Sequence, residues 1–260
     1  MSDFLETMAA SSAARAAAAP SFVDADFDKP VVPLALSAFD VIAELKRRSP
    51  AEGELQQAGG SDPVSRAQAY VEGGAAAISV LTEPSRFDGE LAHLEEIVAA
   101  VPDTPVMRKD FLVDPVQVLE ARAAGASGVL LITTMLDDAT LGTMLDRAFE
   151  HGMFVLLESF DVDDLLRSAR FLNRDGQLLI GVNTRNLRTL EVDGERLQRL
   201  SASLPAATCV AESGLRTADD AARVAEYGYT MALVGSALMR SDAPADLVGA
   251  MRAAGAAACS

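Results

Sequence analysis

Eight short apolar runs alternate with longer amphipathic stretches from one end of the chain to the other. Each run has the length of a buried strand, and polar turn residues follow it. The predicted strands are residues 39–44, 76–81, 105–109, 128–132, 154–158, 178–183, 208–212 and 232–235. Strands that alternate with helices over short connections form parallel βαβ units. Eight units in 260 residues predict an α/β fold, a closed (β/α)8 TIM barrel of about the usual 250 residues, rather than an open doubly wound sheet.

The segments between the strands support one continuous domain. The clearest helical stretches are residues 114–124, 137–151 and 217–227. No Gly-x-Gly-x-x-Gly follows the first strand, which counts against a dinucleotide-binding fold. No linker or shift in composition divides the chain, so we expect a single barrel domain over residues 1–260. Residues 1–35 are expected to form a short N-terminal helical extension, with a helix over 4–19 that ends at Pro20.

The charge balance limits the partners. Acidic residues outnumber basic ones by 38 to 22, which gives a formal net charge of -16. A strongly acidic surface repels nucleic acid and anionic membranes, so we expect neither as a partner. No run of about 18 apolar residues is present to span a bilayer. An anionic small-molecule substrate would need a local cationic pocket.

The cysteines and the N-terminus indicate the cellular compartment of the protein. Cys209 and Cys259 are far apart in sequence and form no Cys-x-x-Cys motif. We interpret them as free thiols in a reducing compartment, and so expect a cytoplasmic protein. The N-terminus is rich in alanine, but it contains Asp3 and Glu6 and lacks the basic start of a signal peptide.

The placement of lysine is selective. Only three of the 22 basic residues are lysines, namely Lys29, Lys46 and Lys109. Lys46 and Lys109 lie where predicted strands end in polar loops. Arginine stays charged, whereas a desolvated lysine can act as an acid, base or electrophile. The two strand-end lysines therefore indicate proton chemistry, although each could also be an ordinary surface lysine.

Other polar residues gather at the same ends of the predicted strands. In a parallel barrel the C-terminal strand ends form the active face. These ends carry Glu44, Lys46, Lys109, Glu158, Asn183, Arg185, Glu212, Ser213, Gly235 and Ser236. Residues two apart on a strand share a face, so Glu44 should project with Lys46, and Asn183 with Arg185. The set predicts a charged pocket, and a solvated rim is the alternative.

Two turns with glycine suggest a phosphate site. Glu212-Ser213-Gly214 follows the seventh strand, and Gly235-Ser236 follows the eighth. Barrel enzymes often bind phosphate at these two loops, where glycine allows close backbone approach and serine adds a hydroxyl donor. A pair of ordinary turns is the alternative. We therefore expect a small phosphorylated substrate.

The remaining polar residues give no sign of a metal or cofactor. His93 lies in a predicted helix and His151 at the end of another, and neither has the spacing of metal ligands. We interpret both as structural and expect no metal and no cofactor. No histidine is placed to activate Ser49 as a nucleophile, so we expect Ser49 to donate a hydrogen bond instead.

Six segments, in order from about residue 39 to 240, resemble signatures of the indole-3-glycerol phosphate synthase family. They are Glu44-Leu45-Lys46-Arg47-Arg48-Ser49-Pro50, Ser79-Val80-Leu81-Thr82-Glu83 with Phe87, Arg108-Lys109-Asp110-Phe111, Gly181-Val182-Asn183-Thr184-Arg185-Asn186-Leu187, Ala211-Glu212-Ser213-Gly214 and Leu233-Val234-Gly235-Ser236. The resemblance implies a (β/α)8 fold and a step of tryptophan biosynthesis. In that step 1-(o-carboxyphenylamino)-1-deoxyribulose 5-phosphate closes to indole-3-glycerol phosphate and loses carbon dioxide and water.

The resemblance also implies roles for the charged residues. Lys109 would be the acid for ring closure. Lys46 would hold the substrate carboxylate and could protonate the departing hydroxyl. Glu158 and Glu44 would be the base and a charge partner, and which residue has which role stays open.

Further residues would bind the substrate by the same resemblance. Asn183 would orient a substrate hydroxyl. The polar end and the phosphate would contact Arg185, Ser213, Gly214, Gly235 and Ser236, with Glu212 and Ser49 also in the binding set. Phe87, Phe111 and Leu187 would pack on the anthranilate ring, or else serve only as core residues.

The chain departs from the family pattern in three places. Thr133-Thr134-Met135 follows the fourth strand, Ser159-Phe160 follows Glu158, and Asn186 stands where aspartate is common. The departures near Thr133 and Phe160 leave room for a related reaction in specialised metabolism. A non-catalytic barrel that binds a phosphorylated metabolite or a partner protein is a separate alternative, and the two lysines with a glutamate argue against it, since a binder needs no titratable lysine. Phosphoribosylanthranilate isomerase shares the barrel, but it would be expected to place cysteine at the first strand. We expect the protein to act as a monomer.

Overall fold

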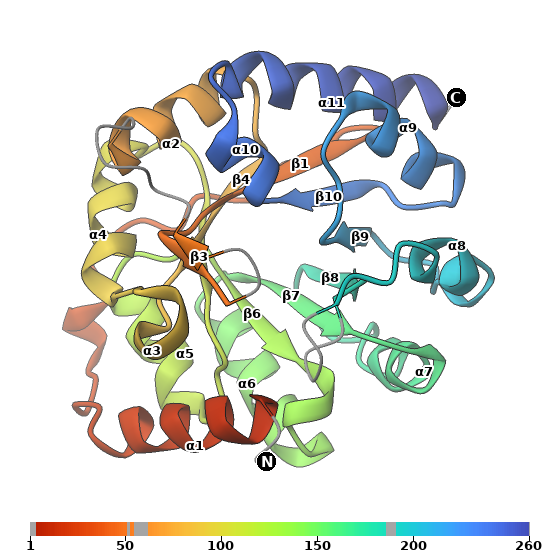
Figure 1. Ribbon diagram of the computed structural model, residues 1–260. Helices are drawn as coiled ribbons and strands as arrows, with labels where there is room; N and C mark the ends of the chain where they lie inside the picture. Colours follow the sequence, from red (N-terminus) through yellow and green to blue (C-terminus); the bar gives the residue numbers. More distant parts are fainter. Residues whose placement is uncertain (1–3, 51–52, 55–61, 186–190, 260) are drawn as a thin grey trace.

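A computed structural model describes residues 4–50, 53–54, 62–185 and 191–259 (Figure 1). Eight parallel strands form a closed barrel in the order β1-β10-β9-β8-β7-β6-β5-β4. The barrel strands are β1 (Asp40–Leu45), β4 (Ala77–Leu81), β5 (Val106–Lys109), β6 (Gly128–Ile132), β7 (Phe154–Ser159), β8 (Leu178–Asn183), β9 (Cys209–Glu212) and β10 (Met231–Val234). The predicted TIM barrel is thus confirmed.

Closure of the barrel is visible in the register of β1. Ala43 lies opposite Val234 of β10 on one side and opposite Ile78 of β4 on the other. The first strand is therefore paired with the last strand as well as with the second. In an open sheet, two strands would each have a neighbour on one side only. Each predicted strand agrees with an observed one to within one residue at either end, because the apolar runs mark the buried strands directly.

Helices surround the barrel. Those of eight or more residues are α1 (Phe4–Ala17), α2 (Pro63–Glu72), α4 (Leu91–Ala100), α5 (Pro115–Ala123), α6 (Asp138–Glu150), α7 (Val162–Ala169), α9 (Ala218–Glu226) and α11 (Pro244–Ala258). Shorter ones are α3 (Pro84–Phe87), α8 (Arg196–Leu200), α10 (Ser236–Arg240), and the 3-10 turns η1 (Asp24–Asp26), η2 (Thr133–Met135) and η3 (Ser201–Ser203). The predicted helices begin one residue early because Asp114, Asp137 and Thr217 are N-caps, whose side chains accept backbone N–H groups.

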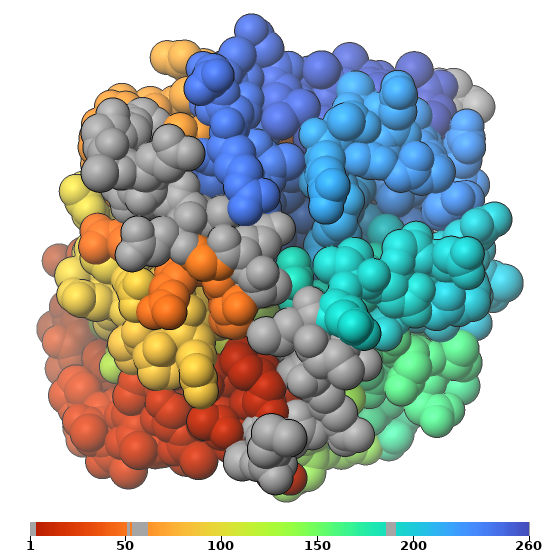
Figure 2. Space-filling model, in the orientation of Figure 1, coloured from red at the N-terminus to blue at the C-terminus, as the bar shows by residue number. Residues whose placement is uncertain are grey.

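Two details of the N-terminal half differ from expectation. Helix α1 ends at Ala17 rather than Ala19, and turn hydrogen bonds join Ala18 to Arg15 and Ala19 to Ala16. The residue before a proline is disfavoured in helical conformation, so the helix unwinds before Pro20. The short antiparallel pair β2 (Arg48–Ser49) and β3 (Gly53–Glu54) was not predicted. In Figure 2, atoms of α1, of this pair and of α10 border the centre of the face shown.

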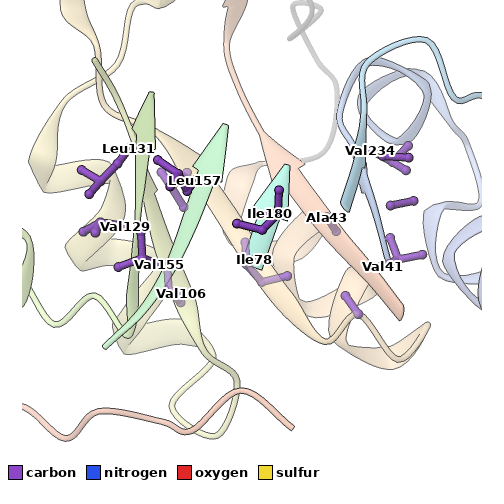
Figure 3. Close-up of a cluster of buried hydrophobic side chains, with 14 of the residues drawn as sticks. Val41, Ala43, Ile78, Val106, Val129, Leu131, Val155, Leu157, Ile180 and Val234 are labelled. Atoms are coloured by element: carbon purple, nitrogen blue, oxygen red, sulfur yellow. The ribbon is translucent and has the colours of Figure 1, made fainter. Parts of the chain in front are cut away.

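Strand alternation divides the core into two layers. Side chains such as Val41 and Ala43 point outward and pack against the helices (Figure 3). Ile42 of the same strand belongs to a second cluster with Leu130 and Leu156 inside the barrel. Successive side chains on a strand point to opposite faces, so Glu44 continues the inward row of Ile42 at the C-terminal end. In the described part of the chain, no helix is long and apolar enough to cross a membrane.

Candidate active site

A cavity of ≈ 540 Å³ opens at the C-terminal ends of the strands, within the size range of sites for small molecules. Every described residue that the sequence analysis assigns to the site lines it. These residues are Glu44, Lys46, Ser49, Phe87, Lys109, Phe111, Glu158, Asn183, Arg185, Glu212, Ser213, Gly214, Gly235 and Ser236. Leu187 and Asn186 lie outside the described residues. The expected convergence of distant strand ends is therefore present.

Lys109 lies among carboxylates at the end of β5. Its Nζ atom is 3.4 Å from Glu158 Oε2 and 4.0 Å from Glu212 Oε2. Burial lowers the pKa of Lys109, but the charges of Glu158, Glu212 and Glu44 together outweigh burial and raise that pKa above its usual value. Lys109 is accordingly an ammonium ion at neutral pH.

Glu44 and Lys46 form a second ion pair in the cavity, with 2.7 Å between Glu44 Oε1 and Lys46 Nζ. They project together because they lie two residues apart at the end of β1. Burial raises the pKa of Glu44, but the charges of Lys46 and Lys109 lower it by more than burial raises it. The net shift of the pKa is therefore downward. Glu44 therefore stays ionised and is a weak base.

Glu212 is the most isolated of the carboxylates. It is 1% exposed, and neither of its carboxylate oxygens has a hydrogen-bond partner among the residues that the structure describes. Burial and the nearby charge of Glu158 raise the pKa of Glu212 well above its usual value. An unsatisfied buried carboxyl group is unfavourable, so Glu212 can accept a polar group of a ligand as its partner.

The loops after β8 and β9 are held by local hydrogen bonds. The side-chain oxygen of Asn183 accepts the backbone N–H of Arg185 at 2.8 Å, which fixes the orientation of the amide. Ser213 and Gly214 both have positive φ angles, 67° and 81°. Such a conformation is strained for serine, and the Thr184 hydroxyl stabilises it by donating to the Ser213 carbonyl at 3.0 Å.

One wall of the cavity is aromatic. The rings of Phe87 and Phe111 lie 6.1 Å apart. Phe4 of α1 contacts Phe111 edge to face at 5.7 Å and also lines the cavity. Phe4 was not predicted from the sequence, because nothing local shows where the N-terminal helix docks. The inward residues Leu130 and Ile132 were not predicted either, although the alternation along the fourth predicted strand could have revealed them.

Asp110 connects the N-terminal helix to the strand end that carries Lys109. Its carboxylate accepts two hydrogen bonds from Arg15, at 2.7 and 2.8 Å, and one from Thr82 at 2.8 Å. Burial raises the pKa of Asp110, but Arg15 and Arg108 lower it by more than burial raises it. The net shift of the pKa is therefore downward. Neither Arg15 nor Asp110 was predicted as a site residue, although a charged residue directly after Lys109 is a usable signal.

The histidines have structural partners. His93 Nδ1 accepts the backbone N–H of Glu90 at 3.1 Å, near the start of α4. The His151 ring lies 4.5 Å from the ring of Phe27. Within the described residues, no three potential metal ligands lie close enough to hold an ion. The expectation of a site without metal or cofactor stays a prediction.

The described departures from the family pattern do not line the cavity. The Ser168 hydroxyl of α7 lies 3.0 Å from the hydroxyls of both Thr133 and Ser159. All three side chains are buried between the strand ends and α7. Thr133 and Ser159 therefore affect the packing of α7, whereas Met135 and Phe160 pack against the cluster inside the barrel.

Comparisons with known proteins agree with the geometry. A family described as indole-3-glycerol phosphate synthase matches residues 12–251. The chain is 44% identical over 243 residues to the indole-3-glycerol phosphate synthase of a Nocardioides species, covering 93% of this chain and 90% of that protein. It is also 44% identical over 240 residues to the Mycobacterium leprae protein of the same name, covering 90% and 84%.

Solved structures resemble the fold. A thiamine phosphate pyrophosphorylase from Pyrococcus furiosus superposes with a TM-score of 0.61 at 17% identity, covering 86% of this chain and 98% of that one. A 3-hexulose-6-phosphate synthase from Salmonella typhimurium gives a TM-score of 0.65 at 18% identity, with 85% and 100% covered. At this identity the likeness concerns the barrel alone.

Proposed function

The chain belongs to the indole-3-glycerol phosphate synthase family, and we propose that the charged residues around its cavity carry out the reaction of that enzyme. The reaction is a step of tryptophan biosynthesis catalysed by a carbon–carbon lyase. In it, 1-(o-carboxyphenylamino)-1-deoxyribulose 5-phosphate closes to indole-3-glycerol phosphate and loses carbon dioxide and water. The meeting of the Lys109–Glu158 and Lys46–Glu44 pairs at one cavity carries the proposal.

In this mechanism Lys109 is the acid for ring closure. Its ammonium group protonates the ribulose carbonyl oxygen as the aryl carbon attacks. The surrounding carboxylates raise its pKa, so the required protonated form is present at neutral pH. Positioned acid catalysis of this kind typically contributes about 10²- to 10⁴-fold in rate.

Lys46 and the glutamates take the remaining steps. Lys46 holds the substrate carboxylate until carbon dioxide leaves, and it can protonate the departing hydroxyl. The lowered pKa of Glu44 makes it a poor base and a good charge partner for Lys46. We therefore assign Glu158 as the base that removes the proton lost when the ring becomes aromatic.

The rest of the cavity binds the substrate. Phe87 and Phe111 pack on the anthranilate ring, and Asn183 orients a hydroxyl of the ribulose chain. Ser49 and Glu212 supply further polar contacts. We assign the phosphate and the polar end of the substrate to residues that follow β8, β9 and β10. These are Arg185, Ser213, Gly214, Gly235 and Ser236.

One assay tests this function. The chain contains no tryptophan, so the indole fluorescence of the product rises against a low protein background. We expect the purified protein to convert the carboxyphenylamino-deoxyribulose phosphate with a steady increase in that fluorescence. Folded protein that gives no increase would overturn the assignment.

We further propose that residues 1–260 form one barrel domain with 1–35 as its extension, and that the protein is a cytoplasmic monomer. One chain supplies both lysine–glutamate pairs of the cavity, which supports a monomer. Cys209 is buried and Cys259 is exposed, and both are free, which suits a reducing compartment. Sedimentation equilibrium should give the mass of a single chain, and a dimer mass would contradict the monomer.

A further inference from the structure

Gly181 occupies a position on the inner face of the barrel, beside catalytic groups. It lies two residues before Asn183 on β8, and it pairs in register with Glu158 of β7. A Cβ atom built on Gly181 would collide with Oε1 of Glu212. It would also lie 3.1 Å from a methyl group of Leu156 and 3.2 Å from the carboxyl carbon of Glu212.

The space over Gly181 is therefore filled by the carboxyl group of the neighbouring strand. No hydrogen bond from a described residue holds the Glu212 oxygens, and the nearest cation, Lys109, is 4.0 Å away. The room over Gly181 is therefore one of the factors that set the place of this carboxyl group. Glycine weakens a strand interior relative to other residues, so strand stability does not explain glycine at this point.

The same arrangement occurs across the cavity. A Cβ atom on Gly235 would collide with Oε1 of Glu44 and would lie 2.9 Å from Nζ of Lys46. Two glycines near strand ends thus each make room for the buried carboxyl group of a glutamate near Lys109. The repetition argues against a chance contact at Gly181.

We propose that Gly181 is a positioning residue, whose missing side chain lets the Glu212 carboxyl group lie across β8 beside Glu158 and Lys109. An added methyl group would push this carboxyl group away from β8 and toward the cavity that Glu212 lines. The set of polar groups around Lys109 would then be rearranged. The catalytic consequence rests on the proposed function, whereas the steric relation between Gly181 and Glu212 does not.

A double-mutant cycle of Gly181→Ala and Glu212→Ala tests the proposal through kcat for ring closure. With Glu212 present, we expect Gly181→Ala to lower kcat by about 10- to 100-fold, the scale of small misplacements in an active site. In the Glu212→Ala background, we expect the same change to alter kcat by less than about twofold, because the displaced group is gone. Equal losses in both backgrounds, or no loss with Glu212 present, would overturn the proposal.

The thermal unfolding midpoints of the same four proteins give a readout that needs no turnover. Gly181→Ala should lower the midpoint when Glu212 is present and should lower it much less in the Glu212→Ala background. If Gly181→Ala prevents folding, recovery by Glu212→Ala supports the proposal, and failure to recover overturns it. A wild-type protein that does not close the ring would count against the proposed function, and the midpoints would still decide the steric relation.

Gly249→Ala is the matched control. Gly249 lies in α11, and the nearest atom to an added Cβ is the Gly73 carbonyl oxygen at 3.7 Å, an ordinary contact. We expect this variant to keep kcat and to keep or raise the unfolding midpoint, because alanine favours a helix interior over glycine. A methyl group on glycine is then not harmful by itself.

Discussion

Lys109 shows how neighbours set the chemistry of a residue. Burial alone would lower its pKa, yet Glu158, Glu212 and Glu44 raise it above the ordinary value of 10.5. The acid form therefore persists throughout the neutral range, and the proton is lost only above that ordinary value. A fall in activity at moderately alkaline pH would have to come from another group.

Lys109→Met tests the acid role. The change removes the ammonium group and keeps a flexible apolar side chain, so we expect the fold to persist while kcat falls by at least about 100-fold. Lys29→Met is the control, because Lys29 is a half-exposed lysine paired with Glu95 far from the cavity. Near-normal turnover in Lys109→Met would show that Lys109 is not the acid for ring closure.

Lys46→Arg separates charge from proton transfer. Arginine keeps the positive charge beside Glu44 but does not release a proton near neutral pH. If Lys46 protonates the departing hydroxyl, kcat should fall while the KM for the substrate changes little. A fully active Lys46→Arg enzyme would mean that this residue only holds an anion.

At the scale of elements, α1 belongs to the site because of the Arg15–Asp110 pair. We expect Arg15→Met to lower the free energy of unfolding by about 1–3 kcal/mol, the range for losing a hydrogen-bond partner of a buried charged group. KM should rise as well, since α1 carries Phe4 into the cavity wall. Denaturant unfolding and steady-state kinetics measure both effects.

The control for α1 is Arg147→Met. Arg147 forms a surface pair with Glu150 on α6, and exposed pairs contribute at most about 1 kcal/mol. An Arg15 variant that behaves like this control in both stability and KM would show that the pair does not anchor the helix.

Asp164 of α7 gives a prediction for pH. Burial raises its pKa from 3.8 to about 6, so the native state holds this proton more tightly than the unfolded state. Its contribution to stability is complete below pH 3.8 and is lost as the pH rises through 6. Asp164→Asn keeps an acceptor for the Phe160 N–H and removes the titration.

The unfolding midpoint of Asp164→Asn relative to wild type should therefore increase as the pH rises through this window. Thermal unfolding in a series of buffers measures the difference. Parallel midpoint curves for the two proteins would show that Asp164 does not titrate in this range.

Sequence alone predicted the elements whose signals are local. Apolar runs located the eight barrel strands, and capping residues explain the helix starts. The β2–β3 pair was missed because two-residue strands carry no periodicity. The docking of α1 through Phe4 and Arg15 was missed because it depends on contacts with Phe111 and Asp110, about a hundred positions further along the chain.

At the scale of the whole molecule, barrel closure brings the strand-end residues together. Parallel strands place all their C-terminal ends on one face, so the convergence of Lys46, Lys109 and Glu158 could be predicted from the sequence. The ion pairs, the isolation of Glu212 and the space over Gly181 could not, because they depend on side-chain packing inside the barrel.

The most direct measurement is a crystal structure of Lys109→Met with the carboxyphenylamino-deoxyribulose phosphate bound. We expect one substrate molecule in the cavity, with its phosphate at the Ser213–Gly214 and Gly235–Ser236 loops. The aryl ring should lie against Phe111, and the carboxylate should contact Lys46. A substrate bound outside the cavity, or with its phosphate at the aromatic wall, would contradict the account.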